Sequence, residues 1–299
     1  MNRFRTVVLL ITLLLITISL ANTPTVETVW QLFERGQVAR AESLFTALQQ
    51  HNPKTPVVVI LQARLAESQF QPDQAIDVLE KGLETFGPNA NLYFELGNAY
   101  SLKVATVSVF KKMGIAKKMK RMWRRAIRLN PQHGRAMLSL AQYYLLAPGF
   151  VGGDADSAEY YLTRLTSFEP KLAYMGRAVQ QQKEKHFSEA RIWLKKVLAL
   201  DSAYAPAYLS LAFTYLQEEH KDSALAVLDQ LLRIQPDNPF ALNQKGRLLF
   251  EDGKLLAARD LFYRALKSDP YLVAAHFYLG RTYEEQESFV KAAKFTVTS

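Results

Sequence analysis

A unit of about 34 residues recurs along most of the chain. One series of alanines has spacings of 34, 83, 32, 34, 34 and 34 residues, at Ala41, Ala75, Ala158, Ala190, Ala224, Ala258 and Ala292. A second series of small residues keeps the same phase, at Ala63, Gly97, Ala141, Ala178, Ala212, Gly246 and Gly280. A period between roughly 20 and 50 residues is typical of stacked repeats, in which each unit packs on its neighbours.

The clearest unit, PFALNQKGRLLFEDGKLLAARDLFYRALKSDP, runs from Pro239 to Pro270. Apolar and small residues three and four apart in its first half predict a helix, which Gly253 ends. The same spacing in its second half predicts a second helix, which ends before Pro270. The small residues Gly246 and Ala258 fall where the two helices must approach closely. One such hairpin cannot bury its apolar faces alone, so stacking on neighbours must form the core.

The pattern resembles the tetratricopeptide repeat. The residues that carry the resemblance are Leu242, Gly246, Ala258, Phe262, Ala265 and Pro270, then Tyr208, Leu211, Ala212, Tyr215, Ala224, Leu228 and Pro236, and finally Leu279, Gly280, Tyr283, Phe289 and Ala292. The resemblance covers nearly everything after residue 22. It implies an all-α, right-handed superhelical solenoid of about seven to eight helix-turn-helix repeats over residues 22–299.

Two repeats, at about 90–133 and 134–170, are enlarged, because the spacing of 83 residues equals two units plus fifteen residues. Ten of these lie between Gly97 and Met119, and they predict a lengthened second helix or two pieces broken near Gly114. This long repeat and the following APGFVGGD are together similar to a group of exported bacterial tetratricopeptide proteins of unassigned role.

The other five extra residues lie in YYLLAPGFVGGDADSAEYY, between Tyr143 and Tyr161. We interpret Pro148 to Gly153 as an enlarged turn, with Asp154 or Asp156 capping the following helix. A partner-contacting loop and a catalytic or metal site are the alternatives. The stretch lacks the glycine spacing of a phosphate-binding loop and the later ligands of a calcium loop.

The formal charge of +9 is concentrated in one segment, since no acidic residue occurs between Glu95 and Asp154. We predict a basic outer face there, made by Lys111, Lys112, Lys117, Lys118, Lys120, Arg121, Arg124 and Arg125. It is either a solvated charged face or, over the basic segment 103–135, a docking site for anionic lipid or an acidic partner. Nucleic acid is not expected as a partner, because an exported protein seldom meets it.

The first residues predict export. Arg3 and Arg5 precede an apolar run from Val7 to Leu20, followed by small residues suited to cleavage after Ala21. Residues 1–21 are therefore a signal peptide or an uncleaved anchor, and the expected location is the periplasm or the outer face of the inner membrane. The chain contains no cysteine, which excludes disulfides, zinc-thiolate sites and thiol nucleophiles.

Catalytic motifs are not found, and neither an enzyme activity nor a cofactor or metal is expected. We predict a non-enzymatic scaffold that binds protein partners in a concave groove lined by the first helices of the repeats. In repeats of this type the positions flanking the packed face line the groove, and here they are Phe213, Phe240, Asn243, Arg247, Phe250, Phe277 and Arg281. The last repeat stops without a polar capping helix, which predicts self-association or partner contact there; a truncated reading frame is the alternative.

Overall fold

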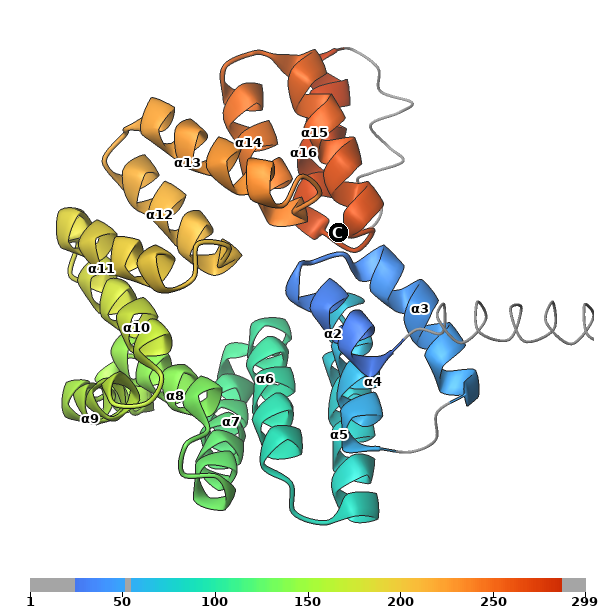
Figure 1. Ribbon diagram of the computed structural model, residues 1–299, viewed down its shortest axis with the longest axis vertical. Helices are drawn as coiled ribbons and strands as arrows, with labels where there is room; N and C mark the ends of the chain where they lie inside the picture. The colour runs from blue at the N-terminus through green and yellow to red at the C-terminus, as the bar shows by residue number, and fades with distance from the viewer. Residues whose placement is uncertain (1–24, 52–54, 287–299) are drawn as a thin grey trace, which may run out of the picture.

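The computed structural model describes residues 25–51 and 55–286 (Figure 1). Within these residues it contains fifteen α-helices, one short 3-10 helix and no strand. The 3-10 helix η1 (Gly149–Val151) lies between α8 and α9. The α-helices are α2 (Val26–Glu34), α3 (Val38–His51), α4 (Pro56–Ser68), α5 (Pro72–Phe86), α6 (Ala90–Thr106), α7 (Val109–Leu129), α8 (Gly134–Leu146), α9 (Ala155–Thr166), α10 (Pro170–Lys183), α11 (Phe187–Leu200), α12 (Ala205–Gln217), α13 (Lys221–Ile234), α14 (Pro239–Glu251), α15 (Leu255–Ser268) and α16 (Val273–Glu285).

These helices form seven consecutive antiparallel pairs, from α2/α3 to α14/α15, and α16 begins an eighth. The predicted all-α repeat solenoid is confirmed. The predicted signal segment and the end of the last repeat, with Phe289 and Ala292, lie outside the described residues. Self-association through the last repeat therefore stays a prediction.

The repeated small residues lie where paired helices touch. Six alanines of the first series, Ala41, Ala75, Ala158, Ala190, Ala224 and Ala258, are fully buried. In the second series, a Cβ atom on Gly246 would lie 2.7 Å from the ring of Phe262, and one on Gly97 would lie 2.4 Å from the ring of Trp123. Because real Cβ atoms do not come so close, each glycine permits a bulky ring on the partner helix to pack against its backbone.

In five of the seven helix pairs, the turn between the two helices contains a left-handed residue at the same position. Gly36 (φ 69°) and Gly253 (φ 73°) occupy this position in two repeats. Phe70, Lys185 and Glu219 take the same conformation in three others, with φ of 56°, 62° and 61°. A side chain in this region costs about 1 kcal/mol or more, so the stacked helices on both sides impose the turn on these residues.

The enlarged repeats differ in their helix lengths and in one turn. α6 and α7 have 17 and 21 residues, against 13 and 14 in α14 and α15, and α7 continues without a break through Gly114. The turn before α9 contains η1, and Asp154 caps α9 by accepting a bond from the backbone N–H of Asp156 at 3.2 Å. A Cβ on Gly153 would overlap the carbonyl oxygen of Ala147 at 1.8 Å, so this glycine is required by the turn itself.

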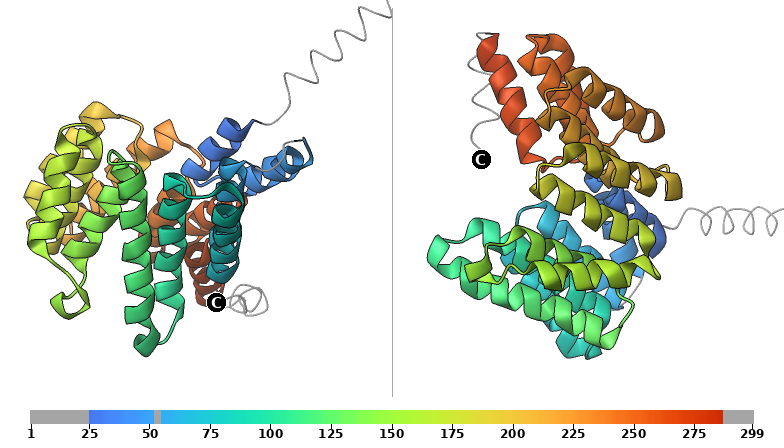
Figure 2. Two further views of the ribbon diagram at one scale, coloured as in Figure 1. Left: turned by 90° about the horizontal axis from the view of Figure 1, so that it is seen from below. Right: turned by 90° about the vertical axis from the view of Figure 1, so that its left-hand side faces the viewer.

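The repeats wind into a ring whose two ends touch (Figures 1 and 2). α3 in the first repeat contacts α15 in the seventh. Gly36 lies against Pro239 and Phe240 at the start of α14, at a distance that leaves no room for a Cβ. Tyr271, which follows α15, is hydrogen-bonded to Glu42 on α3 and to Gln69 after α4. The concave side of the solenoid therefore faces the inside of a ring that is closed by the contact between its first and seventh repeats.

Candidate functional site

The interior is lined by the first helix of successive repeats, and it contains several connected cavities. A cavity of about 520 Å³, hereafter the seam cavity, lies where the two ends of the ring meet. Helices α2, α4 and α6 line it on one side, and Phe240 and Tyr271 line it on the other. A second of about 520 Å³ lies on the side of α8, α10 and α12, lined by Lys171 and Tyr204. Glu34 and Arg135 line both cavities. The side chains around these two residues therefore form the centre of the candidate site.

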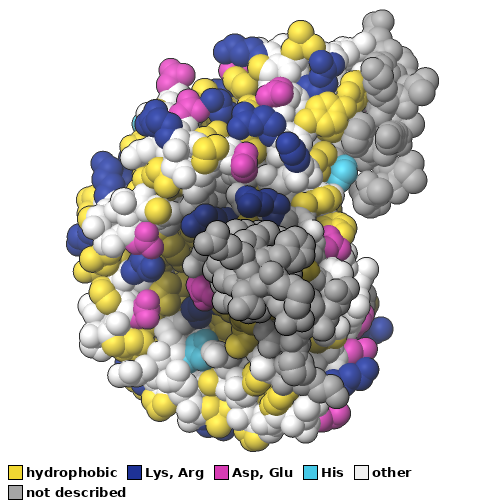
Figure 3. Space-filling view, turned by 45° about the vertical axis from the view of Figure 1, so that its right-hand side comes forward, with side chains coloured by type: hydrophobic (Ala, Val, Ile, Leu, Met, Phe, Trp, Pro, Cys, Tyr) yellow, Lys and Arg dark blue, Asp and Glu magenta, His cyan; other side chains and the backbone are white. Residues whose placement is uncertain are grey.

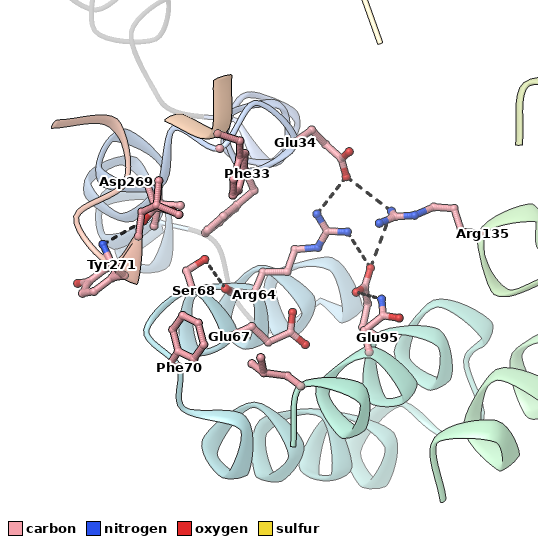
Figure 4. Close-up of a pocket in the computed structure, with 16 residues that line it drawn as sticks. Phe33, Glu34, Arg64, Glu67, Ser68, Phe70, Glu95, Arg135, Asp269 and Tyr271 are labelled. Atoms are coloured by element: carbon pink, nitrogen blue, oxygen red, sulfur yellow. Dashed lines mark hydrogen bonds and ion pairs between the residues drawn. The ribbon is translucent and has the colours of Figure 1, made fainter. Parts of the chain in front are cut away.

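Two arginines and three glutamates, hereafter the interior cluster, meet at this centre (Figure 4). Arg64 on α4 lies 3.0 Å from Glu34 on α2 and 2.9 Å from Glu95 on α6. Arg135 on α8 approaches the same two carboxylates at 3.6 and 3.9 Å. The fifth member is Glu67, one helical turn after Arg64. Four consecutive first helices thus contribute charges to one network, which fixes how these repeats are stacked.

The members of the interior cluster differ in how much of each side chain is exposed to solvent. Glu95 is 3% exposed and Arg64 13%, whereas Arg135 is 44% exposed to the interior. The arginines also lie over aromatic rings, with the Arg64 guanidinium 4.0 Å from the ring centre of Trp30 and that of Arg135 4.9 Å from Phe94. Such contacts are favourable where the cation has lost water. Glu34 is 48% exposed, so Glu34 and Arg135 are the acid and the base of the cluster best placed to contact a bound molecule.

Burial raises the pKa of Glu67 to about 8, and the negative charge of Glu95 adds to this effect. The positive charges of Arg64 and Arg135 only partly oppose it. One carboxyl oxygen of Glu67 is buried without a hydrogen-bond partner. Glu67 is thus held mostly protonated at neutral pH, which leaves two carboxylates to balance two arginines in the interior cluster.

Histidine has a structural role at this site. His133 precedes α8, and its Nδ1 accepts a bond from the backbone N–H of Ala136 at 3.2 Å. Burial lowers the pKa of His133, so the neutral ring that this capping bond needs is favoured. In the described part of the chain, no three His, Asp or Glu side chains are grouped as ligands for a metal ion.

The predicted groove residues are brought together in part. Phe213, Phe240 and Arg247 line one cavity of about 280 Å³ with Leu209 and Leu216, hereafter the groove pocket. Phe213 is 47% exposed and Phe240 44% exposed. Phe240 also lines the seam cavity, so the groove pocket and the interior cluster belong to one continuous surface.

The remaining predicted groove residues lie elsewhere. Asn243 is only 5% exposed, so it belongs to the packed face of α14 and not to the open surface. Phe250 is half-buried against Tyr278, and the exposed Phe277 lies on α16 beside the same tyrosine. Arg281 lies 3.4 Å from Glu284 and 3.5 Å from Glu285. Arg247 is paired with Glu251 at 2.9 Å, so a ligand carboxylate must compete with acids on the same helices for both arginines.

The predicted basic face lies on α7, the second and outer helix of its repeat. Lys111, Lys112, Lys117, Lys118, Arg121, Arg124 and Arg125 are exposed, and Lys120 is half-buried. Lys120 lies over the ring of Tyr143 at 4.8 Å, and burial lowers its pKa, with the charges of Arg124 and Lys117 adding to this effect. This face is separate from the interior, because the cavities are lined by first helices.

The interior cluster was not predicted from the sequence, although a signal for most of it exists. In the unit from Pro239, the predicted groove residues Phe240, Asn243, Arg247 and Phe250 lie six and three residues before, and one and four residues after, the small residue Gly246. In the repeat of Ala63, the positions one and four residues after this alanine are Arg64 and Glu67. In the repeat of Ala141, the position six residues before this alanine is Arg135. Glu95 does not follow this rule, since it lies on the packed side of α6.

Comparison with known proteins agrees with this architecture. A tetratricopeptide-repeat family model matches residues 182–243. The human protein O-mannosyl-transferase TMTC3 is 27% identical over 262 residues, which are 86% of this chain and 27% of that protein. This chain therefore spans about a quarter of the length of that relative.

Two solved structures share the fold over most of the chain. Yeast Tom70 has a TM-score of 0.59 at 16% identity, covering 86% of this chain and 53% of Tom70. A tetratricopeptide repeat protein from Parabacteroides merdae has a TM-score of 0.53 at 15% identity, covering 86% of this chain and 96% of that one. Solenoids of this kind are generally scaffolds that bind other proteins on their concave surface. The repeat pattern, the helix pairs and these matches agree, and they show that the chain has a tetratricopeptide-repeat fold.

Proposed function

We propose that this protein is a non-enzymatic scaffold that holds a segment of a partner protein in its interior. The observation that carries the proposal is the groove pocket, where Phe213 and Phe240 stay nearly half exposed beside Arg247. Apolar side chains of this size, exposed inside a concave surface, are typical anchor points for an apolar side chain of a partner.

The bound segment has a second contact in this proposal. Phe240 separates the groove pocket from the seam cavity, where Arg135 is 44% exposed and is the more exposed of the two arginines of the interior cluster. A segment with an apolar residue in the groove pocket and a polar or acidic residue toward Arg135 matches both surfaces.

The transferase activity in the name of TMTC3 belongs to a protein of which the match covers 27%, and we do not extend it to this chain. No helix of the described ranges is long and apolar enough to cross a membrane. We place the scaffold in the cell envelope, outside the inner membrane. This part of the proposal rests only on the sequence of residues 1–21, in which two arginines precede an apolar run.

Site-specific photocrosslinking tests the groove. Benzoylphenylalanine replaces Phe213 in one variant and the exposed Ile192 on the outer helix α11 in a matched control. The proposal expects a discrete protein adduct from position 213 and none of that mass from position 192. The partner so identified should bind the Phe213→Ala variant at least about tenfold more weakly, while Ile192→Ala changes affinity little. Equal binding by both variants, or an adduct from position 192 alone, would contradict the proposal.

A further inference from the structure

The outer face of α7 combines two kinds of side chain in one stripe. Residues three or four apart lie on the same side of a helix, and here they are Phe110, Met113, Lys117, Arg121, Arg124 and Arg128. The opposite side carries Met119, Trp123 and Ala126, all buried against the neighbouring helices. The stripe therefore begins with two apolar residues and continues with four cations, of which Arg124 also donates a hydrogen bond to the hydroxyl of Tyr144 on α8.

Within the described residues, none of the nine cations of α7 lies within ion-pair distance of an acid. They are Lys111, Lys112, Lys117, Lys118, Lys120, Arg121, Arg124, Arg125 and Arg128. Lys103 and Arg135, at the ends of the same basic segment, are paired with Asp73 and Glu34. The C-terminal repeats show the usual arrangement, in which both signs are interspersed (Figure 3) and pairs such as Lys245–Asp229 form. Among the described residues the cations of α7 thus have no ion-pair partner, and Arg124 and Arg125 contact the hydroxyl groups of Tyr144 and Tyr93 instead.

Apolar side chains are exposed on the same edge of the molecule. Phe110 is 97% exposed, Met113 43% and Phe150, at the tip of the turn before α9, 83%. Lys120 connects α7 to the turn before α9. Its Nζ lies over the ring of Tyr143 on α8, and it is 2.6 Å from the position that a Cβ of Gly152 in the turn would take. The α6–α7 hairpin and the α8–α9 turn project side by side from the ring (Figure 2).

We propose that this edge docks on an anionic phospholipid bilayer. Phe110, Met113 and Phe150 enter the interfacial layer, and the cations of α7 contact the lipid headgroups. Aromatic rings favour the headgroup level of a bilayer, and lysine and arginine near an anionic surface strengthen binding. An acidic protein would satisfy the cations equally well, but a projecting edge with an almost fully exposed phenylalanine fits a flat, deformable surface better. Docking through α7 leaves the interior free, so it does not depend on the scaffold function.

The test uses the absence of cysteine from the sequence. Phe110→Cys and Phe150→Cys are each labelled with the environment-sensitive dye NBD, and Leu256→Cys, an exposed site on α15, is the matched control. With vesicles of phosphatidylcholine and phosphatidylglycerol in equal parts, the dye at positions 110 and 150 should brighten and shift to the blue. The dye at 256 should not. Vesicles of phosphatidylcholine alone should give little response.

Charge variants complete the experiment, and every variant keeps the natural N-terminal segment. Lys117→Gln with Arg121→Gln should weaken binding to the anionic vesicles by about 25-fold, since each cation contributes about a factor of five. The control, Lys195→Gln with Lys267→Gln, removes the same charge from exposed sites on α11 and α15 and should change binding less than twofold, about the precision of the measurement. Sedimentation with vesicles without a response at 110 and 150 would overturn the proposal, as would equal binding to neutral vesicles. A response to polyglutamate but not to vesicles would replace the bilayer with an acidic protein.

Discussion

Tyr271, in the turn between α15 and α16, donates a hydrogen bond from its Oη to Oε2 of Glu42 on α3 at 3.1 Å, across 229 positions of sequence. Gln69 donates to both, with Nε2 3.2 Å from Oη of Tyr271 and 3.2 Å from Oε1 of Glu42. Three polar side chains from the first and last parts of the solenoid thus hold the seam of the ring. The interior cluster lies directly behind this seam, so closure of the ring and access to the candidate site are linked.

We predict that Tyr271→Phe loosens the seam without unfolding the repeats. The variant loses hydrogen bonds at one end contact, with a cost of about 1 kcal/mol, whereas each helix pair keeps its neighbours. Spin labels on Gln49→Cys in α3 and Lys267→Cys in α15 report the distance across the seam. The distance distribution should broaden toward longer values with Tyr271→Phe and stay unchanged with Tyr160→Phe, an exposed tyrosine on α9. An unchanged distribution in the first variant would show that packing at Gly36 alone keeps the ring closed.

We predict that Glu67 makes the protein less stable as the pH rises. The pKa of Glu67 is about 8 in the folded chain, against 4.5 for an ordinary glutamate. Between these two values the folded state binds more protons than the unfolded state, so the free energy of unfolding falls with rising pH and levels off above about pH 8. Glu67→Gln removes this loss, because the amide stays neutral.

Urea unfolding at about pH 6 and about pH 9 measures the effect. Wild type should lose about 3 kcal/mol more stability between the two pH values than Glu67→Gln does. Glu84→Gln, at an exposed position of α5, should follow wild type. If Glu67→Gln and wild type lose stability in parallel, Glu67 ionises normally and does not sit in the interior cluster as a neutral acid.

The sequence predicted the repeat and most of the helix boundaries, because these depend on local spacing. Ala41 and Ala258 mark close helix contacts in any chain with this period, and Gly253 marks a turn. Three of the seven predicted groove residues converge in one pocket for the same reason, since they occupy fixed positions on a first helix. The prediction for Asn243 shows the limit of local spacing as a guide to exposure. A rotation of one helix by a fraction of a turn is enough to bury a side chain that flanks the packed face.

Contacts between distant repeats could not be predicted in this way. The pairing of Tyr271 with Glu42 depends on the small rotation between successive repeats, summed over most of the chain, and local patterns do not specify that sum. Glu95 was missed because a glutamate on a packed face is unusual unless a cation is buried with it. That cation, Arg64, comes from another repeat.

We predict that the two arginines of the interior cluster differ sharply in their effect on stability. Arg64→Ala leaves Glu95, which is 3% exposed, without its close partner and should cost about 3 kcal/mol. Arg135→Ala removes a side chain that is 44% exposed and lies farther from both carboxylates, so it should cost less than about 1 kcal/mol. Replacing both Arg64 and Glu95 by apolar residues of similar size should recover most of the loss. Urea unfolding checks all three variants, and equal losses for the two arginines would contradict this description of the cluster.

We predict that Gly114→Ala stabilises the protein. Gly114 lies inside the continuous helix α7, and a Cβ there would meet no atom within 4 Å. Alanine is favoured over glycine inside a helix by about 0.5–1 kcal/mol, so the melting temperature and the hydrogen-exchange protection of α7 amides should both rise. Gly97→Ala is the matched change in the neighbouring helix α6, where a Cβ would lie 2.4 Å from the ring of Trp123. That variant should lose about 1–3 kcal/mol, because the ring must move away from its packed position. A loss of stability in Gly114→Ala would instead mean that the helix is broken at this glycine, and the exposed stripe from Phe110 to Arg128 would not lie on one face.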